Sequence, residues 1–216
     1  HAGLTKGLFD AARVWLSGLP GGLAVATVFG AAGFAAVTGS SVACAAAMGR
    51  IAVPEMMRHR YDVSLATGTV AAAGTIGALI PPSILMIIYG IIAEVPISKL
   101  FLGGVGAGLL TAFGYVMVIT IRASLNPELA PRLTEKVPLA EKVAALKDTW
   151  PVILLMGCVF GGLFGGLFTP TEAGAVGAFL SLVIAGLKGS LTWMSFKNAL
   201  LETLLTSASL FIIAIG

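Results

Sequence analysis

The sequence predicts an all-α integral membrane protein, on the grounds of its composition and its charge pattern. Of the 216 residues, 57% are hydrophobic and 11% are charged, whereas soluble proteins carry about 25% charged residues. The mean hydropathy is +1.00. Several runs contain no Asp, Glu, Lys or Arg, and a membrane-spanning helix needs about 20 apolar residues. These runs are residues 14–49, 63–93, 100–121, 149–171 and 173–187.

Composition also excludes several classes of function. The net charge of +3 comes from basic residues that flank the apolar runs, which is typical of membrane topology and not of a nucleic-acid surface. The histidines are His1 and His59, and the cysteines Cys44 and Cys158 lie inside apolar runs. Neither a Ser–His pair nor a metal site is therefore predicted. No G-x-x-x-x-G-K-[ST] sequence is present. We expect no enzyme activity, no cofactor and no direct use of ATP.

The first apolar run is too long for one crossing of a membrane. As a single helix, residues 14–49 would be about 54 Å long, and the hydrocarbon core is about 30 Å thick. Both flanks are basic, which places both ends on the same side. We predict an interfacial arm helix over 1–20 and a re-entrant hairpin over 21–57, with its tip at Thr38-Gly39-Ser40-Ser41. Two short full spans are the alternative.

The second apolar run, together with the residue before it, forms the segment 62–93. This segment contains residues that interrupt a helix. Pro81 and Pro82 supply no backbone N–H, and Pro82 turns the preceding residue away from helical geometry. Gly74 and Gly77 loosen the turn before them. We therefore predict a discontinuous membrane helix whose unwound centre is buried in protein or lines a cavity.

The remaining segments are more regular. Within 123–148, a polar cytoplasmic loop, apolar residues at helical spacing predict an interfacial helix. At "FTPTEAG", Pro170 is expected at a turn and Thr171 as the cap of the next helix. This topology puts every Lys and Arg except Lys99 on one side of the membrane. The other predicted segments are a span over 99–122, two scaffold spans over 150–187, an amphipathic connector over 188–199 and the start of a further span over 200–216.

The two interrupted segments are adjacent in sequence, which is typical of the midplane site of a secondary transporter. Hydroxyls of Thr38, Ser40 and Ser41 and carbonyls freed between Gly77 and Pro82 would form a cage of neutral oxygens. Hard cations prefer oxygen ligands, and half-helix N-termini favour an anionic substrate. The alternative is a channel or structural membrane subunit, in which Ser and Thr only bond helices together.

Three motifs occur in the order found in one transporter family. They are "VTGSSVACAAAMGRIAVPEM", "GTIGALIPPSILMIIYG" and "GGLFGGLFTPTEAGAVGA". Together they resemble the large membrane subunit of tripartite ATP-independent periplasmic (TRAP) transporters, over nearly the whole chain. The resemblance implies an elevator-type fold of the ion transporter superfamily with inverted repeats, of which about half is present here. We therefore expect the chain to be a partial, central segment that lacks the second hairpin and second sodium site.

The resemblance also implies roles for single residues. The family's hairpin tip matches Thr38, Gly39 and Ser40, and many members have an Asp shortly after it where this chain has Cys44. The family's first sodium site also uses backbone at the helix break. The predicted sodium-binding residues are Thr38, Ser40, Gly77, Ile80 and Pro82. The predicted substrate-binding residues are Gly39, Ser41, Thr75, Pro81 and Ser83.

The resemblance further implies an activity and partners. The activity is sodium-coupled import of an organic acid, such as a C4-dicarboxylate or sialic acid, with Na⁺ as the coupling ion. A soluble periplasmic binding protein delivers the substrate, and a small membrane subunit pairs with the large one in the bacterial inner membrane. A transporter of the same superfamily that works without a binding protein is the alternative.

Overall fold

A computed structural model describes residues 4–131, 138–147 and 149–215. The parts of the predicted segments 1–20, 123–148 and 200–216 that fall on 1–3, 132–137, 148 and 216 lie outside the described residues. Within the described residues every regular element is helical, and no strand is present. The prediction of an all-α chain is confirmed.

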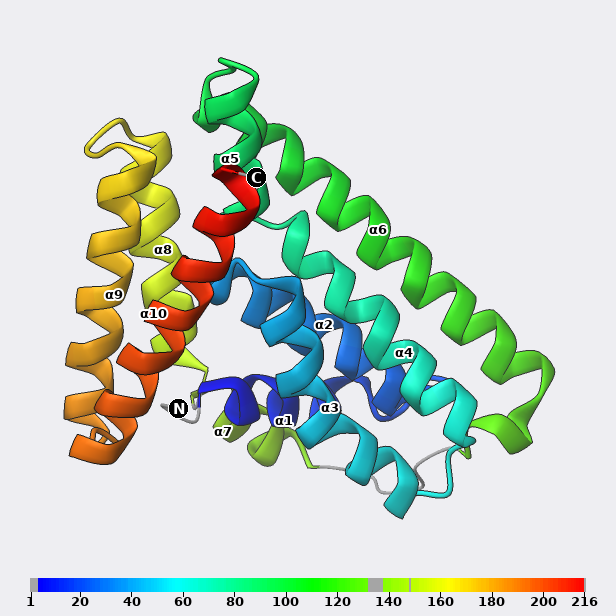
Figure 1. Ribbon diagram of the computed structural model, residues 1–216. Coiled ribbons are helices and arrows are strands. Elements are labelled where there is room, and N and C mark those ends of the chain that lie inside the picture. The colour runs from blue at the N-terminus through cyan, green and yellow to red at the C-terminus, as the bar shows by residue number, and fades with distance from the viewer. Residues whose placement is uncertain (1–3, 132–137, 148, 216) are drawn as a thin grey trace.

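Ten α-helices and two short 3₁₀-helices follow one another along the described chain (Figure 1). The α-helices are α1 (Leu4–Leu16), α2 (Gly22–Thr38), α3 (Ser41–Arg58), α4 (Val63–Thr75), α5 (Ile84–Ile92), α6 (Ile97–Leu125), α7 (Leu139–Lys147), α8 (Trp150–Phe164), α9 (Pro170–Leu187) and α10 (Trp193–Ile215). The 3₁₀-helices are η1 (Ile76–Ala78) and η2 (Pro127–Leu129). The last helix thus starts within the segment predicted as a connector and continues into the segment predicted as a further span.

The helices differ in whether they are long and apolar enough to cross a membrane. Among the described residues, α6 and α9 are each long and apolar enough to span, and α7 and α8 together form a third candidate bent by 49°. Helix α2 is apolar but has 17 residues, which corresponds to about 25 Å. It is shorter than a hydrocarbon core of about 30 Å. The first arm of the predicted hairpin is therefore short for a full crossing.

The larger of two hydrophobic cores lies between α1, the α2–α3 pair, α4 and the second half of α6. Helix α1 packs against α2 and lies next to α7 across one end of the molecule (Figure 1). Phe9 of α1 and Met48 of α3 are fully buried, and both lie over Gly30 of α2. A glycine at this position lets the arm helix and both arms of the α2–α3 pair approach closely.

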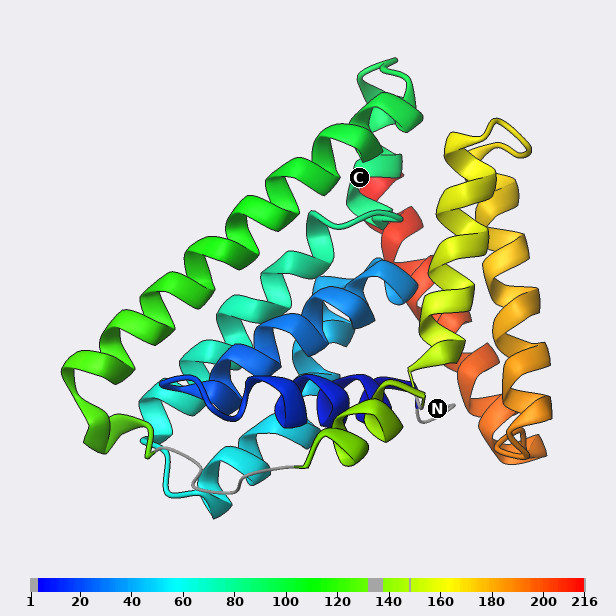
Figure 2. The same ribbon diagram turned by 180° about the vertical axis from the view of Figure 1, so that it is seen from behind.

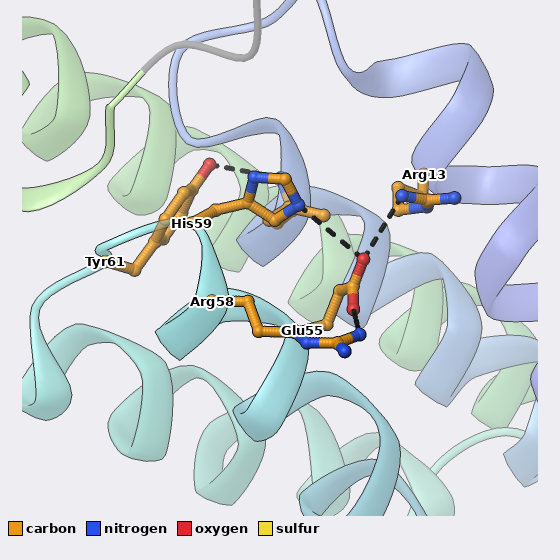
Figure 3. Close-up of polar contacts among 6 residues, drawn as sticks. Arg13, Glu55, Arg58, His59 and Tyr61 are labelled. Carbon is orange, nitrogen blue, oxygen red and sulfur yellow. Dashed lines mark hydrogen bonds and ion pairs between the residues drawn. The ribbon is translucent and has the colours of Figure 1, made fainter.

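Charged residues join α1 to the end of α3 that lies farthest from the α2–α3 tip (Figure 3). The Arg13 Nη1 donates to Glu55 Oε1 at 3.1 Å. The same carboxylate lies 3.7 Å from Arg58 Nη1 and 3.6 Å from His59 Nε2. Exposed ion pairs each contribute little, but Glu55 is only 22% exposed. This cluster holds the arm helix against the base of the α2–α3 pair.

The second core is formed by the start of α6 together with α8 and α9. Phe101 of α6 is fully buried in it. Val37, near the end of α2, and Met86 of α5 pack against this core. The α2–α3 tip therefore lies between the two cores, with α8 on one side and the α4–α5 break on the other (Figure 2).

The turn between α8 and α9 corrects one prediction. Thr169, not Thr171, is the N-cap of α9, and Pro170 is the first helical residue. The Thr169 hydroxyl accepts the Glu172 N–H at 3.4 Å, and the Glu172 carboxylate accepts the Thr169 N–H at 2.7 Å. Proline suits the first helical position because its missing N–H would have no intrahelical partner there. The residue before this proline is therefore the cap.

Candidate functional site

The tip of the α2–α3 pair consists of two residues. Gly39 ends α2 with φ 64°, and its N–H bonds to the Ala35 carbonyl at 2.8 Å. Only glycine adopts this left-handed conformation readily. Ser40 then begins α3 by accepting the Ala43 N–H with its hydroxyl at 3.3 Å. The chain thus reverses direction with one glycine and one capping serine.

The break between α4 and α5 spans η1 and the two prolines. Helix α4 tightens into η1, and the chain then leaves helical geometry until Ser83 caps α5. The Ser83 hydroxyl is buried, donates to the Ala78 carbonyl at 2.7 Å and accepts the Met86 N–H at 3.5 Å. One side chain therefore joins the last residue of η1 to the first turn of α5.

The tip and the break meet backbone to backbone. The Gly39 carbonyl accepts the Ile84 N–H at 3.2 Å. A Cβ on Gly39 would overlap the Pro82 carbonyl oxygen, and a Cβ on Gly77 would lie 2.9 Å from both the Ser40 carbonyl oxygen and the Ser41 Cα. Glycine is needed at both positions because neither backbone can move away without separating the two segments. We call this contact, residues 38–41 against 76–84, the tip–break junction.

The structure brings most of the predicted residues to this junction. Thr75 is the clearest exception, because its hydroxyl contacts Tyr115 of α6 at 2.9 Å. Ile80 packs against Gly108 of α6. Thr38 donates to the Phe34 carbonyl at 3.0 Å and lines a cavity of about 430 Å³ with residues of α9 and α10. The residues of the backbone contact itself are Gly39, Ser40, Ser41, Gly77, Pro82 and Ser83, and Pro81 is buried beside them.

Four helix ends with opposite polarity lie around the junction. Helix α2 ends at Gly39 and α4 runs into η1, and the carbonyls at these C-terminal ends carry partial negative charge. Ser40 and Ser83 are the N-caps of helices α3 and α5, and the first N–H groups of these helices carry partial positive charge. No Asp, Glu, Lys or Arg lies between residues 14 and 49 or between 63 and 93. The junction can therefore offer neutral oxygens to a cation and N–H groups to an anion.

Two glycines of α6 contact the break, and Tyr115 of α6 contacts Thr75 just before it. The sequence analysis missed all three residues. Gly104 lies against the Leu79 carbonyl, and Gly108 lies against Ile80. The signal was present, because glycines spaced four residues apart are typical of close helix contacts in membranes. What the pattern cannot provide is the partner, which lies on a segment more than 20 residues earlier.

The chain is similar to a family of known proteins over its whole length. The family model "Tripartite ATP-independent periplasmic transporter, DctM component" matches residues 1–216. The chain belongs to the DctM family of TRAP transporter large permeases. The predicted resemblance is confirmed, and several relatives of this chain are named as TRAP transporter large permeases.

Three curated relatives show how similar the chain is to other members of the family and how much of their length it covers. A C4-dicarboxylate TRAP transporter large permease protein of Pseudomonas aeruginosa is 39% identical over 85% of this chain and 42% of its own length. A putative TRAP transporter large permease protein of Haemophilus influenzae is 36% identical over 99% of this chain and 53% of its own. A sialic acid TRAP transporter large permease protein of Vibrio cholerae is 30% identical over 100% and 50%. The chain thus spans about half the length of these DctM relatives.

Proposed function

We propose that this chain carries one half of the transport site of a sodium-coupled importer of an organic acid. Sodium would bind at the tip–break junction, between the Ser40 hydroxyl and carbonyls of the break. The observation that supports this most directly is the backbone contact of Gly39 and Gly77 with the opposite segment, in a region without charged side chains. Neutral oxygens hold a monovalent ion weakly enough to release it.

The substrate in this proposal is an anion of the organic acid class. One relative is named for C4-dicarboxylates and another for sialic acid, which are both carboxylates. The N-terminal ends of α3 and α5 provide the N–H groups that a carboxylate would accept. Ser41 and Ser83 lie at these ends and remain our candidates for substrate contacts.

Binding of the ion and of the substrate would be coupled through the shape of the junction. Sodium between the tip and the break would fix the orientation of the α3 and α5 ends, and a carboxylate would bind well only to that arrangement. In the elevator mechanism that we propose, α2–α5 then move as a unit against α8 and α9. The separate cores on either side of the tip are consistent with such a division.

The proposal includes partners and a location. A periplasmic binding protein would deliver the acid, a small membrane subunit would pair with the permease, and the assembly would lie in the bacterial inner membrane. The description of the family as tripartite and periplasmic supports these partners.

Uptake into proteoliposomes tests the proposal. A permease that carries these 216 residues, reconstituted with its binding protein and small subunit, should accumulate a radiolabelled dicarboxylate or sialic acid only with an inward sodium gradient. Accumulation without sodium would overturn the coupling. A channel would equilibrate the acid without concentrating it, and that result would overturn the transporter itself.

Ser40 variants separate the two roles of that hydroxyl. Ser40→Ala removes both the cap of α3 and the proposed ligand, whereas Ser40→Gly removes the ligand and keeps a tolerated N-cap. Both should raise the sodium concentration for half-maximal uptake. Ser209→Ala is the matched control, because its hydroxyl bonds within α10 to the Leu205 carbonyl at 2.9 Å. Normal sodium dependence in Ser40→Gly would exclude the hydroxyl as a ligand.

A further inference from the structure

One face of α6 lies against the end of α4 and part of the helix break. A Cβ on Gly104 would lie 2.6 Å from the Leu79 carbonyl oxygen, and a Cβ on Gly108 would lie 2.7 Å from Cγ1 of Ile80. Further along the same helix, the Tyr115 hydroxyl lies 2.9 Å from the Thr75 hydroxyl. The glycines thus let α6 touch the unwound segment directly, and Tyr115 contacts the last residue of α4.

The direction of the Tyr115–Thr75 hydrogen bond follows from the other bond of Thr75. The Thr75 hydroxyl has one hydrogen, and it donates that hydrogen to the Ala72 carbonyl at 2.7 Å. The Tyr115 hydroxyl must therefore be the donor and Thr75 the acceptor. A chain of two hydrogen bonds runs from α6 through Thr75 to the backbone of α4, at the point where α4 tightens into η1.

We propose that α6 stabilises the ion-binding conformation of the helix break, with Tyr115 acting as a positioning residue through Thr75. Tyr115 touches neither the tip nor the proposed ion ligands, so its effect would reach the ion only through the conformation of residues 75–80. The inference rests on the proposed sodium site at the tip–break junction. It assigns Thr75 to the support of the break instead of to the substrate.

The physical consequence is a change in population. An unwound segment has few internal hydrogen bonds, so contacts from a neighbouring helix decide how often it adopts one conformation. If only a fraction of the molecules holds the binding shape, the apparent dissociation constant rises by the inverse of that fraction. Saturating sodium draws the population back. The loss of the Tyr115 hydroxyl should therefore weaken apparent sodium affinity and leave the maximal uptake rate nearly unchanged.

Sodium titration of uptake in proteoliposomes tests whether Tyr115 and Thr75 support the break. Tyr115→Phe keeps the ring and removes the hydroxyl, and it should raise the half-saturating sodium concentration by about 3- to 10-fold, as expected for one hydrogen bond. Thr75→Val removes the acceptor and should have a similar effect. Thr75→Ser keeps the hydroxyl and should restore the wild-type value. The double variant Tyr115→Phe, Thr75→Val should be no worse than either single variant.

Matched controls come from the same helices. Thr67 of α4 donates to the Val63 carbonyl at 2.8 Å and, within the described part of the chain, makes no bond to another helix. Tyr89 of α5 is 58% exposed. Thr67→Val and Tyr89→Phe should therefore leave the sodium half-saturation unchanged.

Three results would overturn this role of Tyr115 and Thr75. A lower maximal rate with an unchanged sodium half-saturation in Tyr115→Phe would indicate general destabilisation. A changed substrate half-saturation in Thr75→Val at an unchanged sodium half-saturation would return Thr75 to the substrate. Additive losses in the double variant would mean that the two hydroxyls act separately. Sodium-independent uptake by the wild-type permease would instead overturn the proposed function, and with it the supporting role of α6 that depends on that function.

Discussion

Two glycine turns in this molecule have similar backbone geometry and different surroundings. Gly39 at the α2–α3 tip has φ 64°, and Gly166 between α8 and α9 has φ 72°. A Cβ on Gly39 would overlap the carbonyl oxygen of Pro82, whereas a Cβ on Gly166 would meet nothing within 4 Å. The first glycine therefore serves both the turn and a contact with a distant segment, and the second serves the turn alone.

The polar groups of the two turns differ in the same way. At the α8–α9 turn, Thr169 and Glu172 satisfy each other's hydrogen bonds over three residues. At the tip–break junction, the Gly39 carbonyl accepts the Ile84 N–H, 45 residues along the chain. A turn that is complete in itself contributes to local stability. A turn completed by a distant segment can transmit a change from one segment to the other, which is what an ion-coupled site requires.

The largest predicted difference is between alanine at the two positive-φ glycines. Gly39→Ala combines backbone strain of about 1–2 kcal/mol with an overlap that forces the tip away from Pro82. We expect sodium-driven uptake to fall by at least about tenfold, because one hydrogen bond and the close approach are lost together. Gly166→Ala should show the strain alone. Uptake at a fixed amount of folded protein checks both.

The control for this comparison is protein stability. Both variants should lower the apparent melting temperature in detergent, and the Gly39 variant more. Equal losses of uptake in the two variants would show that the tip–break contact has no part in transport beyond the turn itself.

The second prediction compares glycines without positive φ. A Cβ on Gly77 would lie 2.9 Å from the Ser40 carbonyl oxygen, whereas Gly68, on α4, has nothing within 4 Å. Gly77→Ala should therefore separate the break from the tip and raise the half-saturating sodium concentration. Gly68→Ala should leave it unchanged and stabilise α4 by up to about 1 kcal/mol, since alanine is the better helix former. Unchanged sodium dependence in Gly77→Ala would contradict a sodium site at the junction.

The sequence was sufficient to predict where the chain is interrupted. Two local features predict the interruptions: the length of the apolar run around Thr38-Gly39-Ser40-Ser41, and the prolines at 81 and 82. Both can be recognised in a single sequence, because each involves only residues that are close together in the chain. The structure has helix ends at both places. The proximity of the two interruptions was inferred only from their being neighbours in the chain.

Other features depended on long-range packing and could not be predicted in this way. The contact of Tyr115 with Thr75 joins residues 40 positions apart, and both are ordinary residues of apolar helices. The sequence analysis placed Pro170 at a turn and chose Thr171 as the cap of the next helix, whereas the N-cap in the structure is Thr169. That choice was wrong, and the preference of proline for the first helical position could have decided it.

The third prediction concerns Ser83, the buried cap of α5. Ser83→Ala leaves the Ala78 carbonyl without its 2.7 Å hydrogen bond in a buried place, which costs about 1–3 kcal/mol. We expect a lower apparent melting temperature and a smaller loss of uptake than for Gly39→Ala, because the backbone contact of the tip with α5 remains. Ser64→Ala is a useful control, since this serine of α4 lies outside the junction. A Ser83→Ala protein as stable as the wild type would show that the two sides of the break do not depend on this hydroxyl.

The smallest predicted effect tests the corrected cap. Thr169→Ala removes the side chain that accepts the Glu172 N–H, and loss of an N-cap costs about 1 kcal/mol. Thr171→Ala should cost much less, because this residue already lies within α9. Amide hydrogen exchange over residues 170–174 should increase in the first variant and stay near wild type in the second. Sodium-driven uptake should be nearly unchanged in both, since the hydrogen bonds between Thr169 and Glu172 lie within this turn and not at the tip–break junction. A loss of uptake in Thr169→Ala comparable to that of Gly77→Ala would mean that the α8–α9 turn takes part in transport, and the distinction between the two turns would fail.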